Sequence, residues 1–96
     1  MNTLEPLCTV EQTEMLQQLG LNVLIDPTIS LAKNWLYEKF GIWIETKVYK
    51  TGFWCEGWDK KLDSCLGSSN NPNPHTAESD CLTEVLKKLT NEKSNS

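Results

Sequence analysis

The sequence contains no arginine, and its 13 acidic residues outnumber nine lysines, which gives a net charge of −4. Arginine is the usual side chain for bidentate contacts with phosphate and guanine. Because duplex binding depends on basic residues that neutralise phosphates, the composition argues against a duplex-binding protein. A lysine-lined groove for a single strand is still compatible with it.

Long hydrophobic runs are missing as well. No stretch approaches the ~20 apolar residues of a transmembrane helix. The first 15 residues contain Glu5 and Pro6 but no basic residue and no apolar core, so they do not resemble a secretory signal. Cys8 lacks the apolar, small-residue context of lipoprotein processing. We therefore expect a cytoplasmic protein without membrane contact, whose cysteines are reduced.

Motifs for chemistry are also absent. The four cysteines contain no C-x-x-C pair, the usual source of structural zinc ligands. His75 is the only histidine, and the sequence places no thiol beside it to form a Cys–His nucleophile. Paired carboxylates, a Ser/His/Asp set and a phosphate loop are not visible. The sequence thus predicts a protein that is not an enzyme and has no cofactor or metal site.

Helix signals open the chain. Thr9-Val10-Glu11-Gln12 matches a capping box, and the helix it starts is expected to run to Leu19 before Gly20. Thr28 caps a second predicted helix that Gly41 ends. Near the C-terminus, the spacing of Leu82, Val85, Leu86 and Leu89 predicts a third helix, with Thr76 as its cap. Residues 91–96 are predicted to be a disordered tail.

Residues 42–66 hold three of the four tryptophans and alternate apolar with polar side chains, which is typical of strands. We predict strands over 42–49, 53–58 and, more weakly, 62–66, joined by a three-residue loop at 50–52 and a turn at 59–61. Residues 67–76, rich in Gly, Ser, Asn and Pro, are expected to be a mobile loop. In this register one face collects the apolar residues of a core: Ile42, Ile44, Val48, Trp54, Trp58, Leu62 and Leu66.

The expected architecture is a single α+β domain over residues 1–90. Its order is helix, helix, three antiparallel strands, helix, because short hairpins make neighbouring strands antiparallel. The helices are expected to cover the core face of the sheet, which gives two layers.

The second face of the predicted sheet carries the remaining aromatics, Trp43, Tyr49 and Phe53, together with Lys47. The same register places Cys55 opposite Cys65 on this face, at a separation of about 4.5–5.5 Å that suits a disulfide. We expect these two thiols to be adjacent, reduced in the cell and oxidisable in air.

An uncovered aromatic face indicates a binding surface. The first interpretation is an interaction module that offers this face to a protein partner or to its own copy. One alternative is that the first helix or the 67–76 loop covers the face, which then has no function of its own. Another is a single-stranded nucleic-acid binder that stacks bases on the aromatics, with Lys47 and Lys50 near the phosphates.

The segments LCTVEQTEMLQQLG and PTISLAKNWLYEKFGIWIE carry a Cys-Thr-x-Glu-Gln start at Cys8, a Pro27-Thr28 helix opening and a Trp35-Leu36 pair. In these features the first half of the chain resembles small uncharacterised proteins of gut anaerobes and of their phages and mobile elements. The resemblance implies a fold and no catalytic residue. The order of elements is also similar to that of double-stranded RNA-binding domains, but acidic residues at 76–80 (TAESD) would repel a duplex.

Overall fold

A computed structural model describes residues 6–94, with side chains up to residue 91. It has an α+β fold, with the predicted order of elements and one antiparallel sheet of strand order β1-β2-β3. The elements are α1 (Val10–Leu19), α2 (Ile29–Phe40), β1 (Ile42–Tyr49), β2 (Gly52–Asp59), β3 (Ser64–Asn71) and α3 (Pro74–Ser94).

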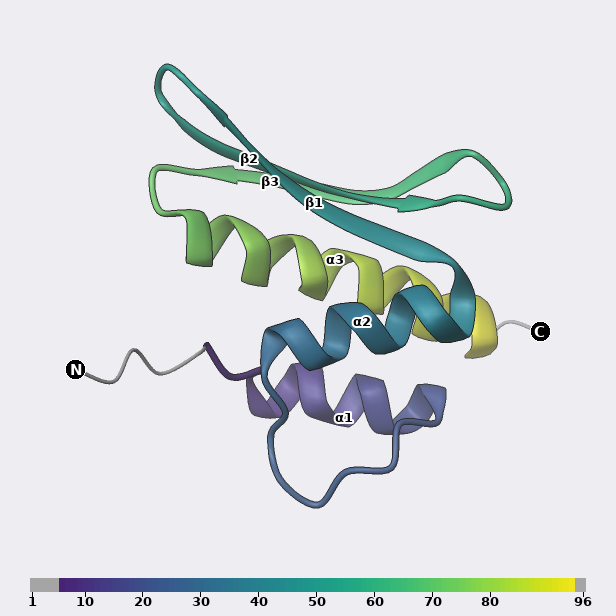
Figure 1. The fold of residues 1–96 in the computed structure, drawn as a ribbon. Helices are drawn as coiled ribbons and strands as arrows, with labels where there is room; N and C mark the ends of the chain where they lie inside the picture. The colour runs from purple at the N-terminus through teal and green to yellow at the C-terminus, as the bar shows by residue number, and fades with distance from the viewer. Residues whose placement is uncertain (1–5, 95–96) are drawn as a thin grey trace.

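The helices lie on one side of the sheet (Figure 1). The long helix α3 packs directly beneath all three strands, and α2 packs against β1. The first helix, α1, packs on α3 and lies farthest from the sheet (Figure 1). Among the described elements, none lies over the opposite side of the sheet, which is called the outer face below (Figure 1).

The predicted caps of the first two helices are confirmed. Thr9 and Gln12 form the reciprocal capping box: Gln12 N donates to Thr9 Oγ1 at 3.1 Å, and Thr9 N donates to Gln12 Oε1 at 2.8 Å. Thr28 Oγ1 accepts from the backbone of α2. Both helices end at glycines with left-handed backbone, φ 114° at Gly20 and 72° at Gly41, a conformation that costs glycine little because it has no Cβ.

Gln12 also joins the first helix to the last. Its side chain is fully buried, and its Nε2 donates to Ser79 O, Ser79 Oγ and Thr83 Oγ1 of α3 at 2.9–3.1 Å. A buried amide needs such partners, because an unsatisfied one costs about 1–3 kcal/mol. One residue therefore both caps α1 and fixes its position on α3.

The predicted strand register is wrong by one residue. The loop between β1 and β2 contains two residues rather than three, and Val48 pairs with Phe53 instead of Trp54. Because strand side chains alternate between faces, this shift moves every β2 side chain to the face opposite the predicted one. Trp54 and Trp58, predicted as core, are on the outer face.

The physical reason is a pair of glycines in β2 and β3 at the point where α3 crosses the sheet. Gly57 pairs with Gly67 across β2 and β3. A Cβ at Gly57 would lie 2.4 Å from Val85 Cγ2, and one at Gly67 would lie 2.8 Å from Glu84 Cβ. The helix thus approaches so closely that no larger side chain fits on this face at the crossing point. Aliphatic side chains fill the core in place of the tryptophans; the fully buried ones include Leu16, Leu36, Leu82, Val85 and Leu86.

The last strand and last helix begin at other residues than predicted. β3 occupies Ser64–Asn71, so it takes up half of the predicted 67–76 loop, and Leu62 is exposed in the turn before it.

Asn73, not Thr76, caps α3: its Oδ1 accepts from the backbone N–H groups of residues 75 and 76 at 2.8 and 3.1 Å. Pro74 suits the first helical position because it has no N–H to satisfy. α3 continues to Ser94, into the predicted tail, while residues 95–96 lie outside the described part.

The predicted Cys55–Cys65 thiol pair is also wrong. Cys55 faces the helices and is fully buried, whereas Cys65 is exposed opposite Trp58. The neighbour of Cys55 is Cys81 of α3, and the hydrogen bond between the two thiols lowers the pKa of Cys55 and, together with burial, raises the pKa of Cys81. Burial also raises the pKa of Cys8, to about 11. Three of the four thiols therefore lie in the interior.

Replacing Gly57 with alanine tests the glycine contact. We expect Gly57→Ala to lower the free energy of unfolding in urea by about 1–3 kcal/mol, because the new methyl group overlaps Val85. In Gly57→Ala/Val85→Ala the added methyl enters the space that the valine leaves, so the double variant should lose less than the sum of the single losses. Ser68→Ala, at an exposed position of β3, serves as the control; additive losses would contradict the contact.

Thiol labelling tests the register. With a water-soluble maleimide, we expect one fast-reacting thiol, Cys65, while the buried thiols react only as the fold opens. Cys65→Ser should remove the fast phase, as followed by intact-mass spectrometry. A second fast thiol identified as Cys55 would support the register with the three-residue loop instead.

Candidate interaction surface

The outer face combines aromatic and charged side chains from all three strands. The register aligns Trp43 with Trp58, Glu45 with Glu56, and Lys47 with Trp54. Trp43 is 48% and Tyr49 43% exposed, and Trp54 and Trp58 are partly exposed. By this alternation the face consists of Trp43, Glu45, Lys47 and Tyr49 from β1, Trp54, Glu56 and Trp58 from β2, and Cys65, Ser68 and Asn70 from β3.

Glu56 organises the centre of the outer face. Lys47 Nζ donates to Glu56 Oε1 at 2.8 Å, and Trp54 Nε1 donates to Glu56 Oε2 at 3.3 Å. The hydrogen bond from Lys47, and to a lesser extent that from Trp54, holds the pKa of the Glu56 carboxyl below its ordinary value. The pairing with Glu56 in turn raises the pKa of Lys47. The carboxylate thus holds an indole and an ammonium group that are themselves neighbours across the two strands.

A shallow hollow of about 290 Å³ lies beside this network. Two of its walls are the indoles of Trp43 and Trp58, and the rest of the lining is charged. Carboxylates outnumber ammonium groups there, so the hollow does not concentrate positive charge. Its lining residues are Trp43, Glu45, Lys47, Glu56, Trp58, Lys60 and Asp63.

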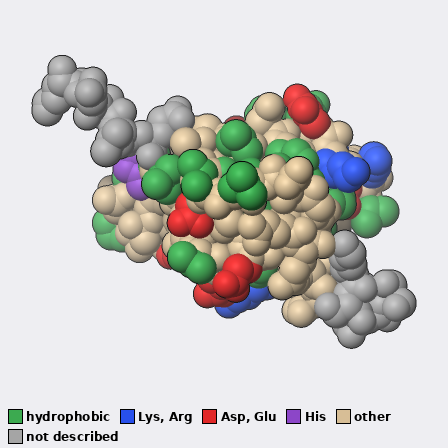
Figure 2. Space-filling model, turned by 90° about the horizontal axis from the view of Figure 1, so that it is seen from below, with side chains coloured by type: hydrophobic (Ala, Val, Ile, Leu, Met, Phe, Trp, Pro, Cys, Tyr) green, Lys and Arg blue, Asp and Glu red, His purple; other side chains and the backbone are tan. Residues whose placement is uncertain are grey.

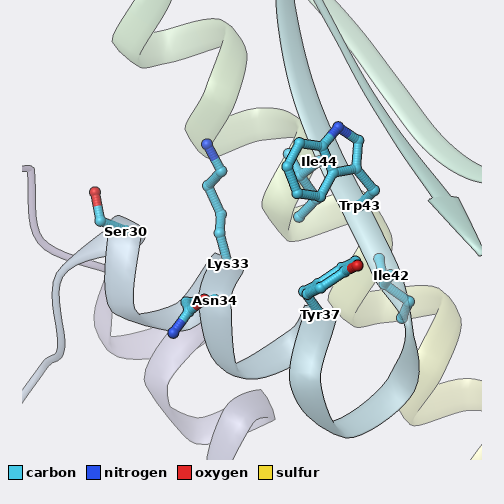
Figure 3. Close-up of a pocket in the computed structure, with 7 residues that line it drawn as sticks. All are labelled: Ser30, Lys33, Asn34, Tyr37, Ile42, Trp43 and Ile44. Carbon is cyan, nitrogen blue, oxygen red and sulfur yellow. The ribbon is translucent and has the colours of Figure 1, made fainter.

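Trp43 also reaches the free edge of β1. Its ring packs edge-to-face on Tyr37 of α2, with ring centroids 5.4 Å apart and planes at 76°. Both residues border a groove of about 240 Å³ between α2 and β1, shown in Figure 3. The groove is lined by Ser30, Lys33, Asn34, Tyr37, Ile42, Trp43 and Ile44.

The structure brings three of the four predicted surface residues together. Trp43, Lys47 and Tyr49 share the outer face, but Phe53 faces the helices and packs partly buried against the core. The sequence interpretation missed Trp54 and Trp58. The signal that could have found them is Gly57, which alternates with Cys55 and Phe53 and so marks the face on which a helix packs closely.

Neither predicted cover lies over the outer face. α1 packs on α3, on the other side of the sheet. Residues 67–71 belong to β3, and residues 74–76 are the first turn of α3. Within the described residues, the aromatic face is therefore open to solvent.

Exposed apolar residues on the helix side are arranged differently. Leu24 is 97% and Ile25 79% exposed in the connector between α1 and α2. Viewed from that side, hydrophobic groups occur in small clusters separated by polar and acidic atoms (Figure 2). On the outer face, by contrast, Trp43 and Trp58 are cross-strand partners, and Trp54 lies on the same face opposite Lys47. Leu24 is consequently a useful control position for studies of the outer face.

Among the described residues, no three His, Cys, Asp and Glu side chains are grouped to hold a metal ion. In this part of the chain, no helix combines the length and apolarity needed to cross a membrane. His75 is exposed in the first turn of α3.

The Glu56 network can be tested by an NMR pH titration. We expect Glu56 to titrate below the ordinary range of a glutamate, and Lys47→Met to raise its pKa because the main donor is lost. Since the pKa is lowered by folding, the network stabilises the fold above the unfolded-state pKa and loses that effect as pH falls through the folded-state pKa. Lys60→Met is the control; an equal shift in both variants would contradict the specific pairing.

Comparisons of the chain with models of protein families, with curated proteins and with solved structures found no match. What the outer face does is therefore inferred from its geometry and its chemistry.

Proposed function

We propose that this chain is a small interaction module that binds another protein through the outer face of its sheet. The observation that carries the proposal is that three tryptophans, Trp43, Trp54 and Trp58, lie on one face that no described element covers. In monomeric proteins, large apolar patches left in water usually mark a contact site. The proposal assigns no catalytic step and places the module in the cytoplasm.

The composition of the face supports a protein partner. Tryptophan and tyrosine are the residues most enriched at the energetic centres of protein interfaces, because each buries a large area with few rotatable bonds. Charged groups of both signs lie among the indoles and offer specific polar contacts to a partner. The hydrogen bond from Trp54 to Glu56 holds one indole in place before binding, which reduces the entropy lost on association.

A single-stranded nucleic acid is the second candidate, because exposed indoles can stack on bases of any sequence. The charges on the face support this candidate less well. Lys47 already pairs with Glu56, and the carboxylates of Glu45 and Asp63 lie in the same hollow. Phosphates would meet net negative charge there, so we favour the protein partner.

Photo-crosslinking from the outer face tests the proposal. With a benzophenone amino acid in place of Tyr49, in cells that carry the chain naturally, we expect a discrete adduct with another protein. Trp58→Ser in the same chain should weaken that adduct at least tenfold, because it removes a buried contact at the interface.

The matched control carries the benzophenone at Leu24, on the helix side. Adducts from position 24 but none from position 49 would overturn the assignment of the surface. Salt-sensitive quenching of tryptophan fluorescence by an oligothymidine, abolished by Trp58→Ser, would favour the nucleic-acid candidate instead.

A further inference from the structure

We propose that two copies of this chain associate edge to edge through β1, so that their sheets join into one antiparallel sheet of six strands. This inference concerns the free edge of β1 and not the outer face. It therefore stands or falls independently of the function proposed above.

The backbone of β1 is free to pair on one side. β1 is an edge strand, with β2 as its only strand neighbour among the described residues. Tyr49 and Gly52 flank the two-residue loop and must form a hydrogen-bonded pair, and in an antiparallel ladder such pairs alternate. Residues 43, 45, 47 and 49 thus bond to β2, while the N–H and C=O groups of residues 42, 44, 46 and 48 point away from it. Thr46 is partly and Val48 largely exposed, whereas Ile42 and Ile44 lie beside α2 and are only 1% and 5% exposed.

The two edges of the sheet differ in their ability to pair. β3 reads SCLGSSNN, a sequence of mostly small and polar residues, and it contains a one-residue register shift. The composition and the shift both weaken the addition of a further strand. β1 reads IWIETKVY, rich in β-branched and aromatic residues, and pairs with β2 without irregularity. Neither proline nor a bulge protects this edge.

Val48 shows that part of β1 lacks a packing partner. Its side chain lies on the helix side of the sheet, where Ile42 and Ile44 are buried, yet it is 75% exposed. The cause is visible in Figure 1, where the hairpin between β1 and β2 bends away from the helices. A strand added at this edge would bring an apolar neighbour to Val48.

One register of self-pairing satisfies both the hydrogen bonds and the charges. With a two-fold axis through Thr46, Ile44 lies opposite the partner's Val48. The N–H and C=O groups of both residues point away from β2, so the two residues can form a hydrogen-bonded pair. Glu45 then lies opposite the partner's Lys47, and the symmetry creates this pair twice. Cross-strand pairs of opposite charge stabilise a sheet, whereas like charges opposite each other destabilise it.

The neighbouring symmetric registers are excluded by charge. An axis through Glu45 would place Glu45 opposite its own copy, and an axis through Lys47 would do the same with Lys47. In the favoured register Lys47 can pair both with Glu56 of its own chain and with the partner's Glu45. Its ammonium carries three donors, and its side chain is 55% exposed.

The groove between α2 and β1 lies beside the path of the partner strand. It borders β1 at residues 42–44, the segment that faces the partner's residues 48–50 in this register. Figure 3 shows the hollow between α2 and this part of the strand, with Ile44 and Tyr37 beside it. The partner's Val48 would approach this apolar lining, and the two outer faces would form one continuous surface.

Sedimentation velocity of the purified chain tests the inference. We expect a dimer whose dissociation constant rises about tenfold or more in Glu45→Lys, because two attractive pairs become repulsive. Lys47→Glu should have the same effect, with its fold checked by circular dichroism. An equimolar mixture of the two variants should again form a dimer, because each copy then faces the opposite charge at both positions.

Leu24→Ser is the matched control and should dimerise like the unmodified chain. A monomer at all concentrations up to about 1 mM, or a dimer that neither variant weakens, would overturn the inference. So would a mixture of variants that remains monomeric while each is folded. None of these results would affect an adduct formed from Tyr49 with a different protein, so the two proposals can fail separately.

Discussion

The rest of the structure depends on the close approach of α3 to Gly57 and Gly67. At this crossing the helix leaves no space for a Cβ, since one at Gly57 would lie 2.4 Å from Val85. The alternation of a strand then places Cys55 on the same, helix-facing side and Glu56 and Trp58 on the other. A requirement of core packing thus determines which side chains form the outer face.

This constraint explains why a small chain exposes its largest side chains. Aliphatic residues of the three helices, together with Ile42 and Ile44 of β1, fill the core, and the tryptophans of β2 lie outside it. They are held in order on the outside instead, by the glutamate between them and by the strand pairing. An aromatic surface that is uncovered and pre-ordered favours association, because little further entropy is lost when it is buried.

The parts of the fold that could be predicted from sequence are those set by local interactions. The caps at Thr9 and Thr28 and the bounds of β1 depend on neighbouring residues. The alternation within β1 is local too, and it predicts the correct face of the sheet for Trp43, Lys47 and Tyr49. The β2 register depends on residues far apart in the chain, Gly57 with Gly67 and Val85. The expectation that large aromatics fill a small core gave the opposite register, and with it the misplacement of Phe53, Trp54 and Trp58.

The two proposed contacts meet on β1, since Trp43 borders both the outer face and the groove at the edge. Edge strands are a hazard because they pair indiscriminately, and charged side chains usually limit that pairing. On β1 the two charges, Glu45 and Lys47, have opposite signs and lie two residues apart. They oppose registers that align like charges and favour the one centred on Thr46. The strand can thus be open to its own copy and still resist unselective aggregation, and pairing in this register would extend the aromatic face without altering it.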